Sequence, residues 1–192
     1  MAAVNMLPPK ALALLVALAA PVAAFAQSEP AVSIGHDEER DAMVVHASID
    51  IEAKPATVWA VISDCDRAPK FVPNMESCRI VDRDPRDRWQ VRETLLNITL
   101  LPRIRSLSRL EFDKDRRITF KQAGGGDMRI AEGEWRVEPL ARGKATRLRY
   151  DAVLALNMAV PHFLVENIAN RDVPALMKNI ERDSLEDEAK KQ

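Results

Sequence analysis

One long helical pattern, residues 161–190, constrains the fold of this chain more than any other stretch. Its apolar residues recur at steps of three and four, which places them on one face of an α-helix: Val165, Ile168, Ala169, Val173, Leu176, Met177 and Ile180. Pro174 lies inside the pattern, removes one backbone donor and predicts a kink. The tail from residue 183 onward is nearly all charged, so we expect it to fray. A helix with one apolar face needs an apolar surface to cover.

The chain between residues 43 and 156 mostly predicts strands, which can supply that surface. Residues 43–53 alternate between apolar and polar side chains, a pattern typical of a half-buried strand. Two short helices follow, the first opened by Pro55. Further strand patterns joined by short turns occupy residues 76–82, 89–97, 103–112, 117–123, 131–137 and 148–156. We therefore expect an α+β fold, in which a curved antiparallel sheet of six to seven strands wraps around a long, kinked C-terminal helix.

The first 26 residues have the organisation of a cleavable signal peptide. Lys10 precedes an apolar run at 11–20, and small residues precede a cleavage site between Ala26 and Gln27. The apolar run is too short for a comfortable membrane span. We expect a processed protein in the periplasm of a Gram-negative bacterium. Residues 27–42 are polar and without periodicity, which predicts a flexible lead-in to one domain at 43–190.

The composition argues against nucleic acids as partners and leaves open whether the two cysteines form a disulfide bond. The net charge is −1 and aromatic residues make up 5% of the chain, so nothing indicates nucleic-acid binding. Cys65 and Cys78 are the two cysteines, and such a pair is often bonded in an oxidising compartment. Cys78 also shares strand phase with Ile80, where a free thiol packs well as a small apolar group. Both readings stay open.

Five short motifs, taken in their order, carry a family resemblance. They are ATVWAVISD at 56–64, PKFVP at 69–73, GEWRVEPL at 133–140, PHFLV at 161–165 and RDVP at 171–174. Across residues 43–188 the chain resembles the helix-grip fold of the START-like (SRPBCC) superfamily. Within it, the chain looks like the polyketide cyclase/coenzyme Q-binding START-domain family. This resemblance implies a deep cavity between the sheet and the long helix that holds an apolar molecule.

The alternation of side chains along each strand and the spacing along the helix predict which side chains line such a cavity. The candidates are Val91, Glu93, Leu95, Ser106, Ser108, Leu110, Phe120, Trp135, Tyr150, Ala169, Val173 and Met177. Glu93 would have a raised pKa inside the cavity and could move protons, or it turns to solvent and pairs with arginine. Ser106 and Ser108 either bind a ligand head group or serve as small wall residues.

Familiar catalytic and metal-binding motifs are absent from the sequence. It contains no Gly-x-Ser-x-Gly, His-Glu-x-x-His, phosphate-binding loop or dinucleotide fingerprint. His36, His46 and His162 are scattered, so we predict no metal site and no cofactor. Arginines at 103, 105, 109, 129, 136, 147 and 149 fall largely on outer strand faces. They form a solvated surface or a docking site for anionic lipid head groups.

Three classes of function fit this sequence. The first is periplasmic binding or transfer of a lipid, quinone, hopanoid or polyketide-like molecule, driven by desolvation of that ligand. The second is a cyclase or dehydratase, which needs inward polar groups that converge on one point. The third is a protein-interaction module without a ligand. We expect a monomer whose partners are an apolar small molecule and, transiently, a membrane surface.

Overall fold

The computed structural model describes residues 28–191, and the expected signal peptide with its cleavage site between Ala26 and Gln27 lies outside them. The strands are β1 Ala31–Asp37, β2 Ala42–Ile51, β3 Met75–Arg83, β4 Trp89–Leu96, β5 Ile104–Asp113, β6 Arg117–Gly126, β7 Met128–Leu140 and β8 Ala145–Leu156. The helices are α1 Pro55–Ile62, α2 Ala68–Phe71, α3 His162–Ala189 and the 3₁₀ turn η1 Ala141–Gly143.

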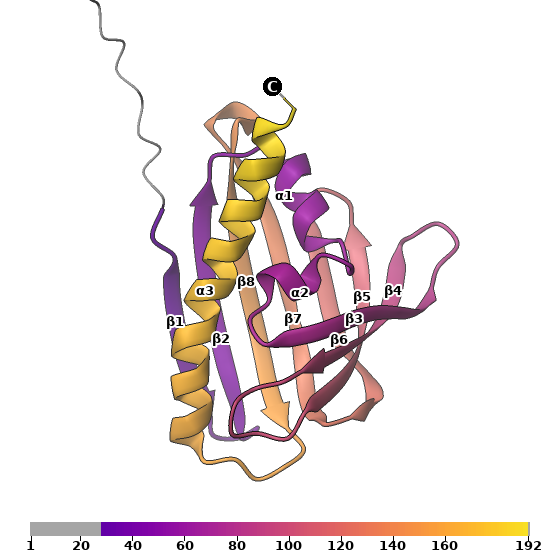
Figure 1. Ribbon diagram of the computed structural model, residues 1–192, viewed down its shortest axis with the longest axis vertical. Helices are drawn as coiled ribbons and strands as arrows, with labels where there is room; N and C mark the ends of the chain where they lie inside the picture. The colour runs from indigo at the N-terminus through magenta and orange to yellow at the C-terminus, as the bar shows by residue number, and fades with distance from the viewer. Residues whose placement is uncertain (1–27, 192) are drawn as a thin grey trace, which may run out of the picture.

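All strands of the described residues belong to one eight-stranded antiparallel sheet in the order β1-β2-β8-β7-β6-β5-β4-β3. Figure 1 shows α3 lying across β1, β2 and β8, while the sheet curves until β3 reaches the side of α2. The predicted α+β fold, with its two short helices and long C-terminal helix, is confirmed. The sheet has one strand more than we expected.

The additional strand is β1, where the sequence predicted a flexible lead-in at residues 27–42. That prediction is wrong for Ala31–Asp37, which pair with β2 in a continuous antiparallel register. Strand β1 is a sheet edge, so only one of its sides has a hydrogen-bonded neighbour. Its side chains are largely exposed, and the alternation that reveals a half-buried strand is therefore weak in its sequence.

The apolar face of α3, which we call its inner stripe, packs on the apolar face of the sheet. Ala169, Val173, Leu176, Met177 and Ile180 are all buried, as the helical periodicity predicted. They join one core cluster with apolar residues of β2 and β8 and of helix α1. The helix continues through Pro174, and the kink expected there stays a prediction.

The charged end of α3 was expected to fray, and it does not. Helix α3 runs to Ala189, and Glu188 is buried. The Thr57 hydroxyl donates to Glu188 Oε2 at 2.5 Å, and Lys54 Nζ lies 3.0 Å from Glu188 Oε1. Arg67 forms an ion pair with Asp187. These partners come from α1 and the connection to α2, so the polar tail packs against polar groups that are remote in sequence.

A disulfide joins Cys65 to Cys78, with Cα atoms 5.4 Å apart. Of the two readings left open by the sequence, the structure contains the bonded one. The bond links the α1–α2 connection to β3, which is the other edge strand of the sheet. In the described part of the chain, no helix has the length and hydropathy needed to cross a bilayer.

Candidate functional site

A cavity of about 700 Å³ lies between α3 and the concave face of the sheet. Its walls come from β1, β2 and the turn between them, from β8, the end of β4 and the starts of β5 and β7. The β4–β5 and β8–α3 loops, the α2–β3 turn and the first half of α3 complete them. Most of the lining is apolar, for example Met43, Val45, Ile104, Leu154, Val165 and Ile168. Ligand sites in proteins commonly have about 300–1,000 Å³, so the volume suits a small organic molecule.

Three of the twelve side chains nominated from the sequence line this cavity. They are Tyr150 on β8 and Ala169 and Val173 on α3. Met177 lies one turn beyond Val173, is completely buried in the core cluster and does not line the cavity. The sequence placed the right helix face toward the sheet, but it could not show where along that face the packing opens.

Strand β4 turns toward solvent the face that the sequence predicted to line the cavity. Glu93 lies on the outer surface, where Arg79 and Arg105 each approach its carboxylate at 2.7 Å. Hydrogen bonds from Arg105 and Arg79 hold the pKa of Glu93 below its usual value, the opposite of the raised pKa expected inside a cavity. Val91 and Leu95 share this phase, and none of the three contributes to the cavity wall.

The inward phase of β4 instead carries Arg92, which is buried, and Leu96, which lines the cavity. The Arg92 guanidinium donates to Gln90 Oε1 and to the Ser63 carbonyl, and it stacks 5.6 Å from the centroid of Phe112. Burial lowers its pKa to about 10. The sequence does not reveal this arrangement because both phases of β4 mix apolar and polar residues.

The remaining candidates on the sheet pack inside the protein without reaching the cavity. Leu110, Phe120 and Trp135 contact the core cluster, and the Ser106 and Ser108 hydroxyls lie 3.4 Å from each other. None of these five belongs to the cavity lining. The two serines therefore act neither as head-group ligands nor as cavity wall in this structure.

Tyr150 on β8 is one of the polar side chains that line the cavity. Its ring stacks on Trp135 with centroids 4.2 Å apart and on Phe120 at 6.2 Å. Burial raises the pKa of its hydroxyl well above the usual value, so the group stays a neutral phenol. A neutral phenol at the wall can donate one hydrogen bond to an oxygen of a bound molecule.

The outer face of the sheet is a network of ion pairs. Arginines predicted to lie there pair with carboxylates on neighbouring strands, as in Arg105–Glu93, Arg136–Asp151, Arg147–Asp50 and Arg149–Glu138. Their charges are largely matched by acidic partners, so this face is a solvated surface rather than an unopposed positive patch. It therefore gives no support to docking of anionic lipids on the sheet.

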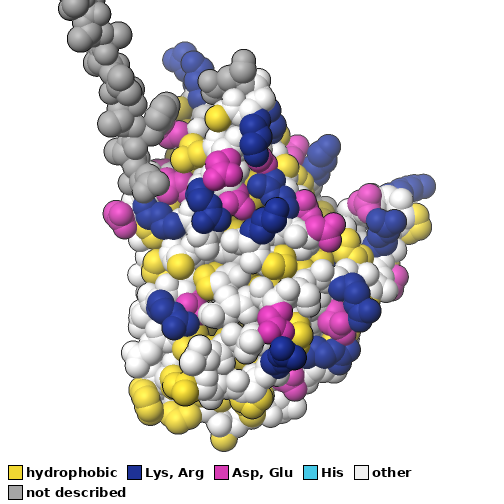
Figure 2. All heavy atoms as spheres, in the orientation of Figure 1, with side chains coloured by type: hydrophobic (Ala, Val, Ile, Leu, Met, Phe, Trp, Pro, Cys, Tyr) yellow, Lys and Arg dark blue, Asp and Glu magenta, His cyan; other side chains and the backbone are white. Residues whose placement is uncertain are grey.

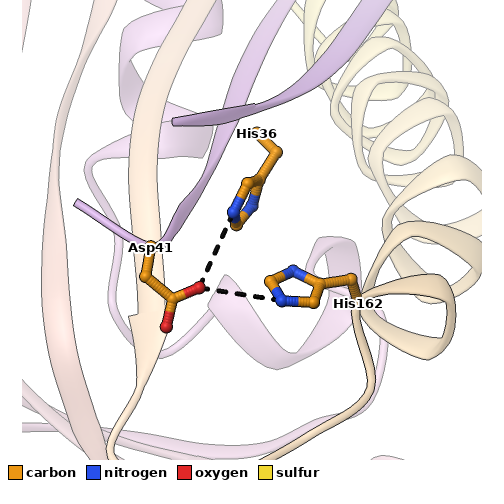
Figure 3. A group of neighbouring side chains, drawn as sticks. All are labelled: His36, Asp41 and His162. Atoms are coloured by element: carbon orange, nitrogen blue, oxygen red, sulfur yellow. Dashed lines mark ion pairs between the residues drawn. The ribbon is translucent and has the colours of Figure 1, made fainter. Parts of the chain in front are cut away.

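Two histidines and an aspartate that the sequence left scattered meet at the mouth of the cavity. Figure 3 shows His36 from β1, Asp41 from the β1–β2 turn and His162 from the start of α3 pointing toward one another. Asp41 Oδ1 lies 3.6 Å from His36 Nε2 and 3.7 Å from His162 Nε2. All three residues line the cavity. Only the pairing of β1 with the sheet and the position of α3 bring them together.

Apolar side chains stand exposed at the same end of the molecule. Leu100 in the β4–β5 loop is 82% exposed, and Phe163 at the start of α3 is 66% exposed. Their chain neighbours Leu101 and His162 line the cavity, so both belong to its rim. Figure 2 shows hydrophobic side chains gathered at this lower end of the molecule, whereas charged groups of both signs cover the upper part.

A curved antiparallel sheet closed by a long C-terminal helix over an apolar cavity defines a START-like, helix-grip protein. The profile of one family, polyketide cyclase / dehydrase and lipid transport, matches residues 51–181. The chain belongs to this family. An abscisic acid receptor of Arabidopsis thaliana, PYL6, is 35% identical over 82 residues, which are 42% of this chain and 38% of that relative.

Solved structures show the same fold at low sequence identity. The Zhui aromatase/cyclase from Streptomyces sp. R1128 is 18% identical with a TM-score of 0.63, covering 73% of this chain and 92% of that one. Human STARD10 is 12% identical with a TM-score of 0.68, covering 84% of this chain and 71% of that one. An aromatase/cyclase and a human START protein thus share one scaffold, so the scaffold alone does not decide between catalysis and binding.

Proposed function

We propose that this protein binds and transfers an apolar small molecule in the cavity between the sheet and α3. The observation that carries the proposal is the cavity itself, about 700 Å³ in volume and lined mainly by aliphatic side chains and methionine. An apolar molecule that enters it leaves water for a mainly apolar environment, which is favourable in proportion to the apolar area buried. Lipids, quinones, hopanoids and polyketide-like compounds all have such surfaces.

The arrangement of polar groups supports an amphipathic ligand with one polar end. Tyr150 offers a buried, neutral hydroxyl to the cavity, while His36, Asp41 and His162 lie exposed at its mouth. A few polar groups in an apolar cavity fix the orientation of a ligand rather than contribute most of its affinity. The abscisic acid receptor in the comparisons is named for a small organic ligand, which fits this ligand class.

The alternative, a cyclase or dehydratase, requires an acid and a base that converge on one bound molecule. The sequence offered Glu93, Ser106, Ser108 and Tyr150 for this role. Glu93 points outward, and the two serines do not contribute to the cavity wall. Tyr150 remains, with a raised pKa that makes it a poor base near neutral pH. These positions support binding over catalysis by the residues that the sequence nominated.

We also propose export, followed by contact with a membrane at the cavity mouth. The Cys65–Cys78 disulfide supports an oxidising compartment outside the cytoplasm. The exposed Leu100 and Phe163 at the rim support transient insertion into a lipid surface, from which an apolar ligand could pass into the cavity without crossing water. Intact mass of the exported protein should correspond to a chain that starts at Gln27.

Purification from the native compartment, organic extraction and mass spectrometry test the binding proposal directly. We expect one apolar compound in stoichiometric amount, displaced by a fluorescent apolar probe that binds the emptied protein. Leu100→Ser with Phe163→Ser should slow ligand exchange with vesicles while leaving equilibrium probe affinity unchanged. Failure of the wild-type protein to retain any apolar compound or probe would refute the proposed function.

A further inference from the structure

We propose that His36, Asp41 and His162 form a binding site for a divalent transition-metal ion such as Zn²⁺ at the mouth of the cavity. The potential ligand atoms of the three side chains all lie within 4.8 Å of one another. Two imidazoles and one carboxylate are a donor set that Zn²⁺ accepts readily. This site stands on its own geometry and does not depend on whether the cavity binds an apolar molecule.

The distances fit an ion better than direct bonding among the three side chains. Asp41 Oδ1 lies 3.6 Å from one imidazole Nε2 and 3.7 Å from the other, beyond the range of about 2.7–3.2 Å for hydrogen bonds. Ligands about 2.0–2.1 Å from a tetrahedral Zn²⁺ lie roughly 3.3–3.4 Å from one another. The two Asp41–imidazole distances therefore need to shorten by only a few tenths of an ångström to match this separation.

The backbone already positions the carboxylate for this role. Asp41 adopts φ 47°, a left-handed conformation in the β1–β2 turn that aspartate tolerates better than most residues. Arg129 donates to the backbone carbonyls of Arg40 and Asp41, and its Nη2 lies 3.5 Å from Asp41 Oδ2. This contact holds one carboxylate oxygen and directs Oδ1 toward the two imidazoles, as hydrogen-bonded groups around metal ligands commonly do.

The charge of Arg129 works against a bound cation, so the affinity should be lower than in a site without that arginine. The rings of His36 and His162 meet edge to face with centroids 4.4 Å apart, and both Nε2 atoms face Asp41 Oδ1. Three protein ligands leave a fourth position for water or for an oxygen atom of another molecule. Because all three residues line the cavity, that position is accessible from it.

A bound ion would connect β1 and its following turn to the first turn of α3. These segments are far apart in the sequence and are held here by exposed side chains rather than by core packing. Zn²⁺ should therefore raise the melting temperature of the wild-type protein, because a ligand that binds the folded state stabilises it. It should also change the rate at which a fluorescent apolar probe leaves the cavity.

Titration calorimetry with ZnCl₂ tests the site on the full, untagged chain after treatment with a chelator. We expect one ion per chain, and with Co²⁺ the visible absorption spectrum of a tetrahedral site. His36→Ala, His162→Ala and Asp41→Asn should each weaken binding by at least about 100-fold, since even groups around the ligands contribute 10–100-fold. Asparagine suits position 41 because it tolerates the left-handed backbone.

His46→Ala is the matched control, because His46 is an exposed histidine that pairs with Asp151 at 2.6 Å on the outer face of the sheet. It should leave Zn²⁺ affinity unchanged. Melting temperatures of all metal-free variants should match the wild type, which separates loss of the site from loss of the fold. Absence of stoichiometric binding, or full affinity in the His36→Ala/His162→Ala double variant, would overturn the proposal.

Discussion

Replacing Val173 with tryptophan distinguishes a ligand cavity from a close-packed interior. Val173 lies on the inner stripe of α3 and lines the cavity. The larger side chain adds on the order of 100 Å² of apolar surface, and complete burial at about 25 cal/mol/Å² would contribute up to roughly 2.5 kcal/mol. In a close-packed wall the same bulk would cost about 1–3 kcal/mol or more.

We therefore expect Val173→Trp to keep or raise the melting temperature of the ligand-free protein. A domain of this size shifts by roughly 2–4 °C per kcal/mol, so the two cases differ by several degrees. The indole also displaces ligand from the wall, and a loss of about 60 Å² of contact corresponds to roughly 1.5 kcal/mol, or about tenfold in probe affinity. Differential scanning fluorimetry and a fluorescent apolar probe measure the two quantities.

Met177→Trp provides the matched control on the same helix. Met177 is completely buried and does not line the cavity, so the added bulk should lower the melting temperature by roughly 2–12 °C. The reasoning is refuted if Val173→Trp destabilises the protein as much as Met177→Trp does. It is also refuted if Val173→Trp folds normally and binds the probe with wild-type affinity.

Three further predictions concern the disulfide, the outer face and the end of α3. Replacing Cys65 and Cys78 with serine should lower the free energy of unfolding by about 3 kcal/mol, or roughly 6–12 °C in melting temperature, because the bond closes a loop with sequence separation 13; an unchanged melting temperature would contradict this. Glu93→Gln should leave probe affinity unchanged, since the carboxylate points outward, and a large loss would place it at the ligand. The hydrogen bond from Thr57 lowers the pKa of Glu188 in the folded state, so its contribution is present above about pH 4.3 and is lost as the pH falls through the lowered value. Denaturant titrations should show a steeper loss of stability below that pH in the wild type than in Glu188→Gln, and equal slopes would argue against the contact.

Periodicity determined most of the fold because each element carries its own pattern. The alternation in β2 and the three-and-four spacing of α3 follow from which faces must be buried, and both elements form where the sequence predicted them. Edge strand β1 shows only a short alternation, in which Val32 and Ile34 pack against the core while most of its other side chains are exposed. The pairing with β2, rather than local sequence, makes it a strand.

The candidate site depends on which face of each strand points inward and on which residues remote in the chain come close together. The sequence predicts both poorly. In β4 the inward phase contains Arg92, whose buried guanidinium bonds to Gln90 and stacks on Phe112, so counting apolar residues selected the wrong face. Along α3, Val173 and Met177 both belong to the core cluster, but only Val173 also lines the cavity. The difference arises from the distance between the helix and the curved sheet, which no spacing within the helix encodes.

The sequence by itself therefore determined most of the elements, their order and, for β2 and α3, the face that each one buries, because these depend on the local repeat of side chains along one strand or helix. Only the tertiary structure decided the volume of the cavity, the bond between Cys65 and Cys78, and the meeting of His36, Asp41 and His162 at its mouth. Each of these is a distance between residues remote in the chain, set by how the sheet curves and where α3 crosses it.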